Sequence, residues 1–386
     1  MPANKPPFDG EWVKLGELIS KAPIERCGDA KYPVYSMTMR DGIVEQAGRF
    51  KKAIASKDTS SYKVVKKNQL VVGFPIDEGV IYVQNHDAPG IMSPAYNVWN
   101  IDLGRVDPSY LEFALHSPRS MAYYADKMRG TTARRRTLTA DGLREMEILL
   151  PSADGQIRVV NTLDEVRSLI EGANGQIAML DTLVKSRFVE MFGGLNSADL
   201  RPLKDVCSII TDGTHQPPKF VDRGIPFLFV SNITSDAVDY ETNKFISVED
   251  YEQLIRRTPI EVGDVLVSAV GSFGHPAIVE DDRPFCFQRH IAYLKPRHDL
   301  IDSSYLHAAL LSEGSQRYMD RCAKGAAQRT VTLKSFKEMK VPLPPLALQQ
   351  EFASFVAEVD KSRFIVQQKI EKLQTLYDSL AQKYFG

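Results

Sequence analysis

Glycine-led loops that carry arginine and glutamine are the features of this 386-residue chain best suited to recognition chemistry. One loop begins at Gly130 and the other at Gly325. Glycine lets the backbone approach another surface closely, and arginine and glutamine can make paired hydrogen bonds to guanine and adenine. We therefore expect contacts to DNA from the polar side chains of both loops. The alternative is a solvated basic turn, or one that docks against helices. The candidates are Arg134, Arg135, Arg136, Gln328 and Arg329.

Further candidates lie in polar loops of the second half of the chain and after the strand-like run 285–288. They are Thr214, His215, Lys219, Ser272, His275 and Arg289. Asp212 and Thr214 can equally build a turn, because Asp and Thr side chains bond to nearby backbone amides. Both interpretations therefore stay open. Phe273 is expected to be buried rather than wedged into a duplex.

Residues for catalysis are not recognisable. The chain has no N-P-P-[FY] or D-P-P-Y methyltransferase motif and no G-x-x-x-x-G-K-[ST] phosphate-binding loop. Its four cysteines are widely spaced with no C-x-x-C pair, and no second ligand lies near His215 in the sequence. We therefore expect no catalytic residue, no bound cofactor and no metal site.

Composition points to a soluble globular protein. The 43% apolar and 25% charged residues are ordinary for that class. No apolar run approaches the roughly 18–20 residues that span a bilayer, and residues 1–8 lack the features of a secretory signal. The 48 basic residues are balanced by 49 acidic ones, which excludes a histone-like polycation but not localised basic surfaces. We expect a cytoplasmic protein with no membrane contact.

The sequence segments that must position these side chains occur as two similar copies along the chain. At an offset of 195, Asp107–Leu111 (DPSYL) matches Asp302–Leu306 (DSSYL), Arg134 meets Arg329, and Leu138 meets Leu333. Beyond residue 140 the offset becomes 193, so that Pro151 matches Pro344 and Phe192-Gly193 matches Phe385-Gly386. An ordered series of matches with few changes of offset indicates a tandem duplication.

Each copy begins with short β-branched runs between glycine and proline turns, which predicts an α+β domain. Each copy ends in a helix-periodic segment with heptad spacing, from Leu163 to Met191 and from Val356 to Tyr384. This pattern is typical of long helices that pack together, and about 37 residues span roughly 55 Å. The alternative is an ordinary core helix in each domain.

In a chain ordered globule–helix–globule–helix, the simplest closed pairing sets the helices antiparallel with a pseudo-two-fold axis across them. The predicted fold is therefore α+β, with two similar globular domains separated by two long antiparallel coiled-coil helices. The expected segments are 1–150 and 196–342 for the globular domains, and 151–195 and 343–386 for the helical spacers. Because DNA half-sites are also related by local two-fold axes, this arrangement predicts a bipartite target, asymmetric since the globules have diverged.

Several short motifs resemble the specificity (S, or HsdS) subunits of type I restriction–modification systems. They are clearest in the second copy: Thr211–His215 (TDGTH), Gly224–Leu228 (GIPFL), Gly263–Ser268 (GDVLVS), Gly325–Arg329 (GAAQR) and the proline-rich Val341–Leu346 (VPLPPL). The resemblance covers the whole chain, as two target recognition domains alternating with two helical regions.

The resemblance implies a non-catalytic DNA-recognition subunit. It implies partners: double-stranded DNA, two methyltransferase subunits that carry S-adenosylmethionine, and endonuclease/translocase subunits that use ATP. Each recognition domain would read one half of a split sequence, and the helices would act as ruler and docking platform. Three alternatives remain: a stand-alone methyltransferase or nuclease, a specificity subunit of a type II-like system with a fused methyltransferase–nuclease partner, and a coiled-coil scaffold that does not bind DNA.

Overall fold

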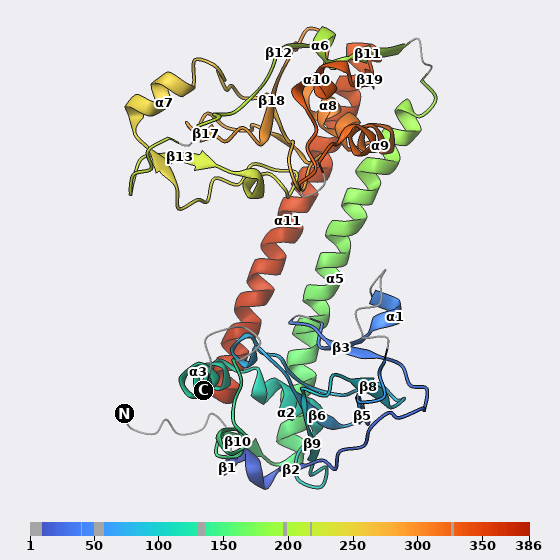
Figure 1. The fold of residues 1–386 in the computed structure, drawn as a ribbon, viewed down its shortest axis with the longest axis vertical. Helices are drawn as coiled ribbons and strands as arrows, with labels where there is room; N and C mark the ends of the chain where they lie inside the picture. Colours follow the sequence, from blue (N-terminus) through green and yellow to red (C-terminus); the bar gives the residue numbers. More distant parts are fainter. Residues whose placement is uncertain are drawn as a thin grey trace. The chain divides into compact units, whose positions relative to one another are not determined.

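Two compact units make up the chain. The computed structural model describes residues 10–39, 41–49, 58–129, 136–195, 199–216, 218–325 and 328–386. The first unit comprises Met1–Asn174 with Gln368–Gly386, and the second comprises Gly175–Gln367. Each unit therefore contains one mixed α+β domain and a part of each of the two long helices, α5 (Ala153–Phe192) and α11 (Leu346–Phe385) (Figure 1).

An antiparallel four-stranded sheet lies at the centre of the first domain. In spatial order its strands are β2 (Ile19–Lys21), β9 (Asn97–Ile101), β6 (Gln69–Val72) and β7 (Ile81–Val83). Leu70 pairs with both Trp99 and Val83, and all three side chains are buried. Aromatic and β-branched residues such as Trp99 and Val83 are favoured in β-strands. Three two-stranded ladders flank it: β1 (Gly10–Lys14) with β10 (Glu147–Pro151), β3 (Tyr35–Met37) with β4 (Ile43–Glu45), and β5 (Lys63–Val65) with β8 (Gly90–Met92).

Short helices connect these strands. They are η1 (Leu15–Glu17), α1 (Gln46–Arg49), η2 (Ile76–Glu78), α2 (Pro108–Leu115), α3 (Pro118–Lys127) and α4 (Ala140–Arg144). Both α2 and α3 begin with proline, which suits the first helical position because its missing N–H has no partner there in any case.

The second domain repeats this plan. Its antiparallel sheet has the order β12 (Cys207–Asp212), β18 (Ile291–Pro296), β15 (Val265–Ser268) and β16 (Pro276–Ile278). A smaller sheet contains β14 (Phe245–Ile246), β13 (Ile225–Leu228) and β17 (Cys286–Phe287), and β11 (Leu200–Pro202) pairs with β19 (Lys340–Pro342). The helices are α6 (Leu203–Val206), η5 (Val230–Asn232), α7 (Val248–Leu254), α8 (Ser303–Leu311), α9 (Glu313–Cys322) and α10 (Leu333–Glu338).

The duplication is confirmed by this shared strand order and by identical helix caps. The Asp107 carboxylate accepts hydrogen bonds from the first amides of α2, both at 2.9 Å, and Asp302 does the same for α8, at 2.8 and 3.1 Å. Such side-chain acceptors satisfy amides that the helix itself leaves without partners. The later helices begin at equivalent hydroxyl caps, namely Ser117 and Ser312, and Thr139 and Thr332.

A buried glutamine joins each long helix to its domain. In the second unit the Gln349 amide group accepts from Asp302 N (2.9 Å) and donates to Leu300 O (3.1 Å) and Pro344 O (2.8 Å). Gln156 makes the equivalent three hydrogen bonds in the first unit, to the backbone of residues 107, 105 and 151. Both side chains are buried, so each hydrogen bond replaces a contact to water that the interior cannot supply.

The predicted heptad seams are confirmed. Every seam position from Leu163 to Met191 in α5 and from Val356 to Tyr384 in α11 is buried or half-buried, while most other positions there are exposed. Both helices have 40 residues, and α5 continues without interruption through Gly172 and Gly175. None of the described helices combines the length and the apolar character that a membrane crossing requires.

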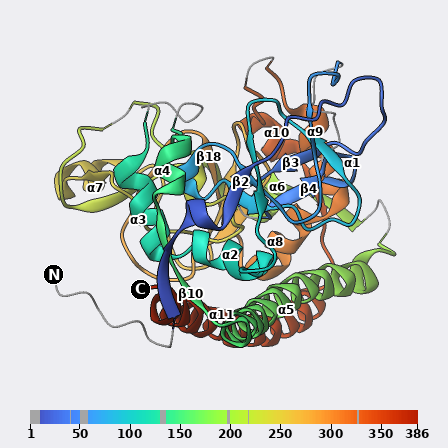
Figure 2. The same cartoon turned by 90° about the horizontal axis from the view of Figure 1, so that it is seen from below.

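The helices run antiparallel within each unit. In the second unit Arg187 pairs with Glu351 (3.1 Å) and Asp181 with Arg363 (2.7 Å), so residue numbers fall along one helix as they rise along the other. In the first unit Phe385, at the end of α11, shares a core with residues 159 and 163 near the start of α5. Figure 2 shows the ribbons of α5 and α11 next to each other. Each pair of helix segments is thus part of the core of its unit.

Candidate nucleic-acid interface

Most of the predicted recognition loops lie at one end of the strands of the four-stranded sheet in the second domain. Strand β12 ends at Asp212, opposite Ala292, and β15 ends at Ser268, opposite Ile291, where β18 begins. The loops 213–219, 269–275 and 288–290 therefore all lie at this end of the strands, which we name the recognition edge. The segment 328–331 joins it, because Val331 N donates to Ala269 O (2.8 Å).

The loop after β12 is fastened to the strand segment before β18. A Cβ atom on Gly213 would lie 2.1 Å from Phe287 O, so only glycine fits there. Thr214 N donates to Phe287 O and Arg289 N donates to Thr214 O, both at 3.0 Å. The Thr214 hydroxyl donates to Gln216 O (2.9 Å), so it builds the turn, as one of the two interpretations held.

Asp212 positions two basic side chains at this edge. Its carboxylate is 12% exposed, and it contacts His215 Nε2 at 3.0 Å and Arg257 Nη2 at 2.6 Å. His215 and Arg257 both keep about half of their side chains exposed. Arg257 was not predicted as a candidate, and the only local signal for it is the pair Arg256-Arg257.

The loop after β15 is shaped by two glycines and a histidine. Gly271 (φ 73°) and Gly274 (φ 88°) adopt left-handed backbone that disfavours other residues. His275 Nδ1 lies 2.9 Å from Asp236 Oδ1, and its Nε2 lies 3.3 Å from the Ser272 hydroxyl. These contacts hold the imidazole in place and leave Ser272 exposed.

Arg329 is committed to partners within its own domain. Its guanidinium pairs with Asp320 at 2.7 Å and lies over the Phe273 ring, 5.2 Å from the centroid. Phe273 is half-buried against the core, as expected. Gln328 is exposed beside this loop, and its amide nitrogen would lie 3.7 Å from a Cβ on Gly271.

The equivalence of Arg134 with Arg329 is wrong; the structure places Arg136 at that position. Arg136 O accepts Ile76 N as Arg329 O accepts Gly271 N. The two bridges that close these loops, 129↔137 and 324↔330, enclose seven and five residues. The first copy therefore has two extra residues here, which shift the offset earlier than the sequence matches indicated.

Arg136 is also paired. Its guanidinium contacts Asp77 at 2.5 Å and Glu78, and the hydrogen bond to Glu78 is the main cause of its raised pKa. A guanidinium held by two carboxylates has little net charge to offer to a phosphate. Arg134 and Arg135 lie outside the described residues.

Arg289 and Lys219 are different, because both are exposed and neither has a carboxylate within ion-pair distance in the described part of the chain. Arg289 Nε lies 3.4 Å from His290 Nε2. Partial burial and the neighbouring Arg289 charge lower the pKa of His290. The edge therefore presents unneutralised positive charge together with the exposed hydrogen-bonding groups of His215 and Gln328.

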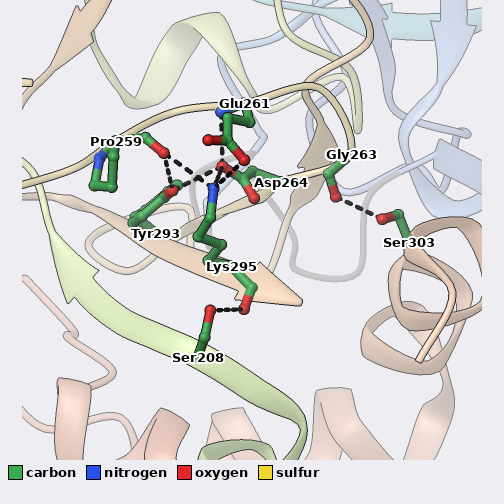
Figure 3. Close-up of polar contacts among 8 residues, drawn as sticks. All are labelled: Ser208, Pro259, Glu261, Gly263, Asp264, Tyr293, Lys295 and Ser303. Carbon is green, nitrogen blue, oxygen red and sulfur yellow. Dashed lines mark hydrogen bonds and ion pairs between the residues drawn. The ribbon is translucent and has the colours of Figure 1, made fainter. Parts of the chain in front are cut away.

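The opposite end of the same strands carries a structural brace (Figure 3). Buried Asp264 accepts from Tyr293 Oη (2.7 Å) and Glu261 N (2.8 Å), and Lys295 Nζ lies 3.3 Å away. Lys295 also contacts Glu261 (2.8 Å) and Pro259 O (3.2 Å). This lysine is thus saturated by protein groups, and the brace fixes the loop before β15.

Across the described ranges, no group of three or more His, Cys, Asp or Glu side chains is arranged to hold a metal ion. The four cysteines are free; three are buried and Cys322 is half-buried. Burial raises the pKa of the Cys286 thiol to about 12, so it is not a reactive thiolate.

The sequence and structure comparisons all return proteins of type I restriction systems. Residues 198–375 match the type I restriction modification DNA specificity domain. The chain is 28% identical over 177 residues to the type I restriction enzyme EcoBI specificity subunit of Escherichia coli, covering 45% of this chain and 37% of that protein. It is 26% identical over 193 residues to the putative type I restriction enzyme MjaX specificity subunit of Methanocaldococcus jannaschii, covering 48% and 45%. The chain thus spans less than half the length of these relatives.

Two solved structures share the fold over nearly the full chain. One is the S subunit of a type I restriction–modification system from M. genitalium, with a TM-score of 0.52, 16% identity, and coverage of 100% of this chain and 98% of that chain. The other comes from work on complex assembly and conformational transition of the type I R-M system, with a TM-score of 0.57, 20% identity and 98% coverage of both chains. At these identities the likeness concerns the fold.

Proposed function

We propose, from the premise that the chain belongs to the type I restriction–modification specificity family, that it is the DNA sequence-specificity subunit of such a system. Each α+β domain reads one half of an asymmetric bipartite target. The observation that carries this proposal is the recognition edge, where three loops and the segment 328–331 bring exposed Arg289, His215 and Gln328 together. Cations at phosphates supply affinity, and hydrogen-bonding side chains at base edges supply sequence preference.

The role that we propose for each candidate residue follows from whether its side chain is already paired within the chain. Arg289 and Lys219 are the side chains for phosphates, because their charge is not neutralised within the chain. His215, Gln328 and Ser272 are exposed donors and acceptors suited to base edges. Arg136 and Arg329 instead shape their loops through ion pairs, so their effect on DNA is indirect.

Catalysis belongs to partner subunits in this proposal. Two methyltransferase subunits bring S-adenosylmethionine, endonuclease/translocase subunits bring ATP, and the specificity chain holds neither; the complex acts on DNA in the cytoplasm. Exposed apolar side chains on the long helices suit the docking of such partners. In the second unit they include Met179 and Val189 of α5 and Phe364 and Ile365 of α11. Contiguous exposed apolar patches mark interaction sites, whereas single exposed apolar side chains do not; Phe364 and Ile365 are neighbours in the sequence and are both exposed.

The proposal is tested by DNA binding of the purified full chain at several salt concentrations. We expect affinity to fall steeply with salt, a preference for one split sequence, and no binding of S-adenosylmethionine until a methyltransferase subunit is added. Binding that ignores salt would favour a coiled-coil scaffold, and S-adenosylmethionine binding by the chain alone would favour a stand-alone methyltransferase. Replacing residues 1–150 with another recognition domain should change one half of the target only.

A system of type II-like design, in which one partner both cuts and methylates, uses the same specificity chain. The partner gene distinguishes the two designs. Sequencing of methylated sites in cells that carry the system identifies both half-sequences and their gap.

A further inference from the structure

The first domain contains a cluster of basic residues that none of its sequence motifs indicated. Lys21 ends strand β2, opposite Trp99 of β9, at the edge of the sheet equivalent to the recognition edge of the second domain. A small cleft of about 70 Å³ opens beside it, lined by Lys21, Lys63 and Asn97 among others. Arg26 lies directly across a backbone bridge from Lys63.

The backbone fixes the positions of these cations. Val64 N donates to Glu25 O (2.9 Å) and Cys27 N donates to Tyr62 O (2.8 Å), so the segment around Arg26 is held along β5. Ala22 N donates to Val98 O (3.0 Å), which holds the residue after Lys21 against β9. The cluster therefore rests on paired backbone rather than on mobile side chains alone.

Their charge is not neutralised. In the described part of the chain, neither Lys21, Arg26 nor Lys63 has a carboxylate within ion-pair distance. The one acidic side chain that lines the cleft, Glu25, is paired with Lys66 at 2.8 Å. Burial, with the positive charges of Lys21 and Arg26, lowers the pKa of Lys63. Like charges held close together repel one another, and a bound anion relieves that repulsion.

Most of their hydrogen-bonding capacity is also unused. Within the described ranges, Arg26 donates a long hydrogen bond to Ser61 O (3.4 Å), and Lys63 donates to Tyr96 O (2.5 Å). An ammonium has three donors and a guanidinium five, so most of these donors remain available. Phosphate oxygens, with a negative charge and several acceptor sites, match this arrangement.

We propose that Lys21, Arg26 and Lys63 form a binding site for the phosphodiester backbone of DNA on the first recognition domain. This inference rests on the proposed function, because it takes DNA as the polyanion. The cluster would hold the first domain on the duplex without reading bases, as Arg289 and Lys219 do on the second. The three residues thus set affinity and its salt dependence, and not the sequence of the half-site.

The test is the salt dependence of DNA binding by the full chain and by the double variant Lys21→Gln/Arg26→Gln, which alters only exposed side chains. Each phosphate contact contributes about 0.9 to the slope of log affinity against log salt. Losing two contacts lowers the slope by about 1.8. Between 50 and 200 mM salt, wild-type affinity should then fall about 12-fold more than that of the variant. Adding Lys63→Gln should lower the slope by a further ~0.9.

Lys14→Gln is the matched control, since Lys14 is an exposed lysine of the same domain that is paired with Glu145 at 2.6 Å. It should leave the slope unchanged. An unchanged slope in the double variant would overturn the phosphate site while leaving DNA recognition intact. A changed preference for bases would also overturn it, because the side chains would then read sequence. If the wild-type chain shows no salt-dependent binding, the proposed function itself fails.

Discussion

We expect Gln349→Ala to destabilise the second unit by about 3 kcal/mol. The substitution removes the partner of one buried donor, Asp302 N, and of two carbonyls, Leu300 O and Pro344 O. Each buried polar group left without a partner costs about 1–3 kcal/mol. We use the lower figure for each, ~1 kcal/mol, because a carbonyl has a second lone pair and water can enter the vacated space.

Gln350→Ala is the matched control. Gln350 is the neighbouring residue of the same type on the same helix, but it is exposed. Exposed substitutions usually change stability by less than about 0.5 kcal/mol. The comparison therefore cancels the difference in helix propensity between glutamine and alanine and isolates the buried hydrogen bonds.

Urea unfolding followed by circular dichroism measures both variants, with amide exchange in α8 as the local readout. The two tryptophans, Trp12 and Trp99, both lie in the first unit, so fluorescence reports on that unit separately. Gln156→Ala should shift the fluorescence transition as Gln349→Ala shifts exchange in α8. If Gln349→Ala costs no more than Gln350→Ala, the buried glutamine does not join helix and domain in the way we describe.

Three further outcomes are expected. Burial raises the pKa of Glu112, so its ionisation costs stability as pH rises above the ordinary glutamate pKa. Glu112→Gln keeps an acceptor for Val83 N and should stabilise the first unit at neutral pH but not below pH ~4. Urea unfolding followed by tryptophan fluorescence measures this difference. Arg289→Gln removes one of two causes of the lowered His290 pKa, and NMR titration should show that pKa rising while DNA affinity falls. Phe364→Ser with Ile365→Ser should weaken methyltransferase binding in pull-down assays with little change in unfolding, because these side chains are 63% and 67% exposed.

For each of these three predictions, a specific result would contradict the reasoning. If the stability difference between Glu112→Gln and the wild-type chain is the same at pH 4 and pH 7, the pKa of Glu112 does not differ between the folded and unfolded states, and burial does not raise it. A constant His290 pKa would place Arg289 too far away to act on the ring. Lost folding in the Phe364/Ile365 variant would mean that these side chains belong to the core of the chain rather than to a docking surface.

The sequence alone determined the duplication, the two long helices and their register. These features are recoverable because they depend on periodicity and on repeated local signals. Asp107 and Asp302 cap equivalent helices through residues two and three positions away, and the heptad seam needs only apolar residues at regular steps. The loops that meet at the recognition edge were also predicted, each separately, from glycine and polar residues.

Only the tertiary structure decided which basic side chains are free. Arg329 was one of the two strongest candidates, with Arg134, and Arg136 belongs to the same basic run as Arg134. Yet the structure pairs Arg329 with Asp320 and Arg136 with two acids that lie 58 and 59 positions away in the sequence. Lys21, Arg26 and Lys63 carry no motif, yet the fold places Lys21 and Lys63 in the lining of one cleft and backbone pairing places Arg26 beside Lys63. The reason is physical: the potential at a cation depends on every charge within several ångströms, and long-range pairing of the chain determines which charges those are.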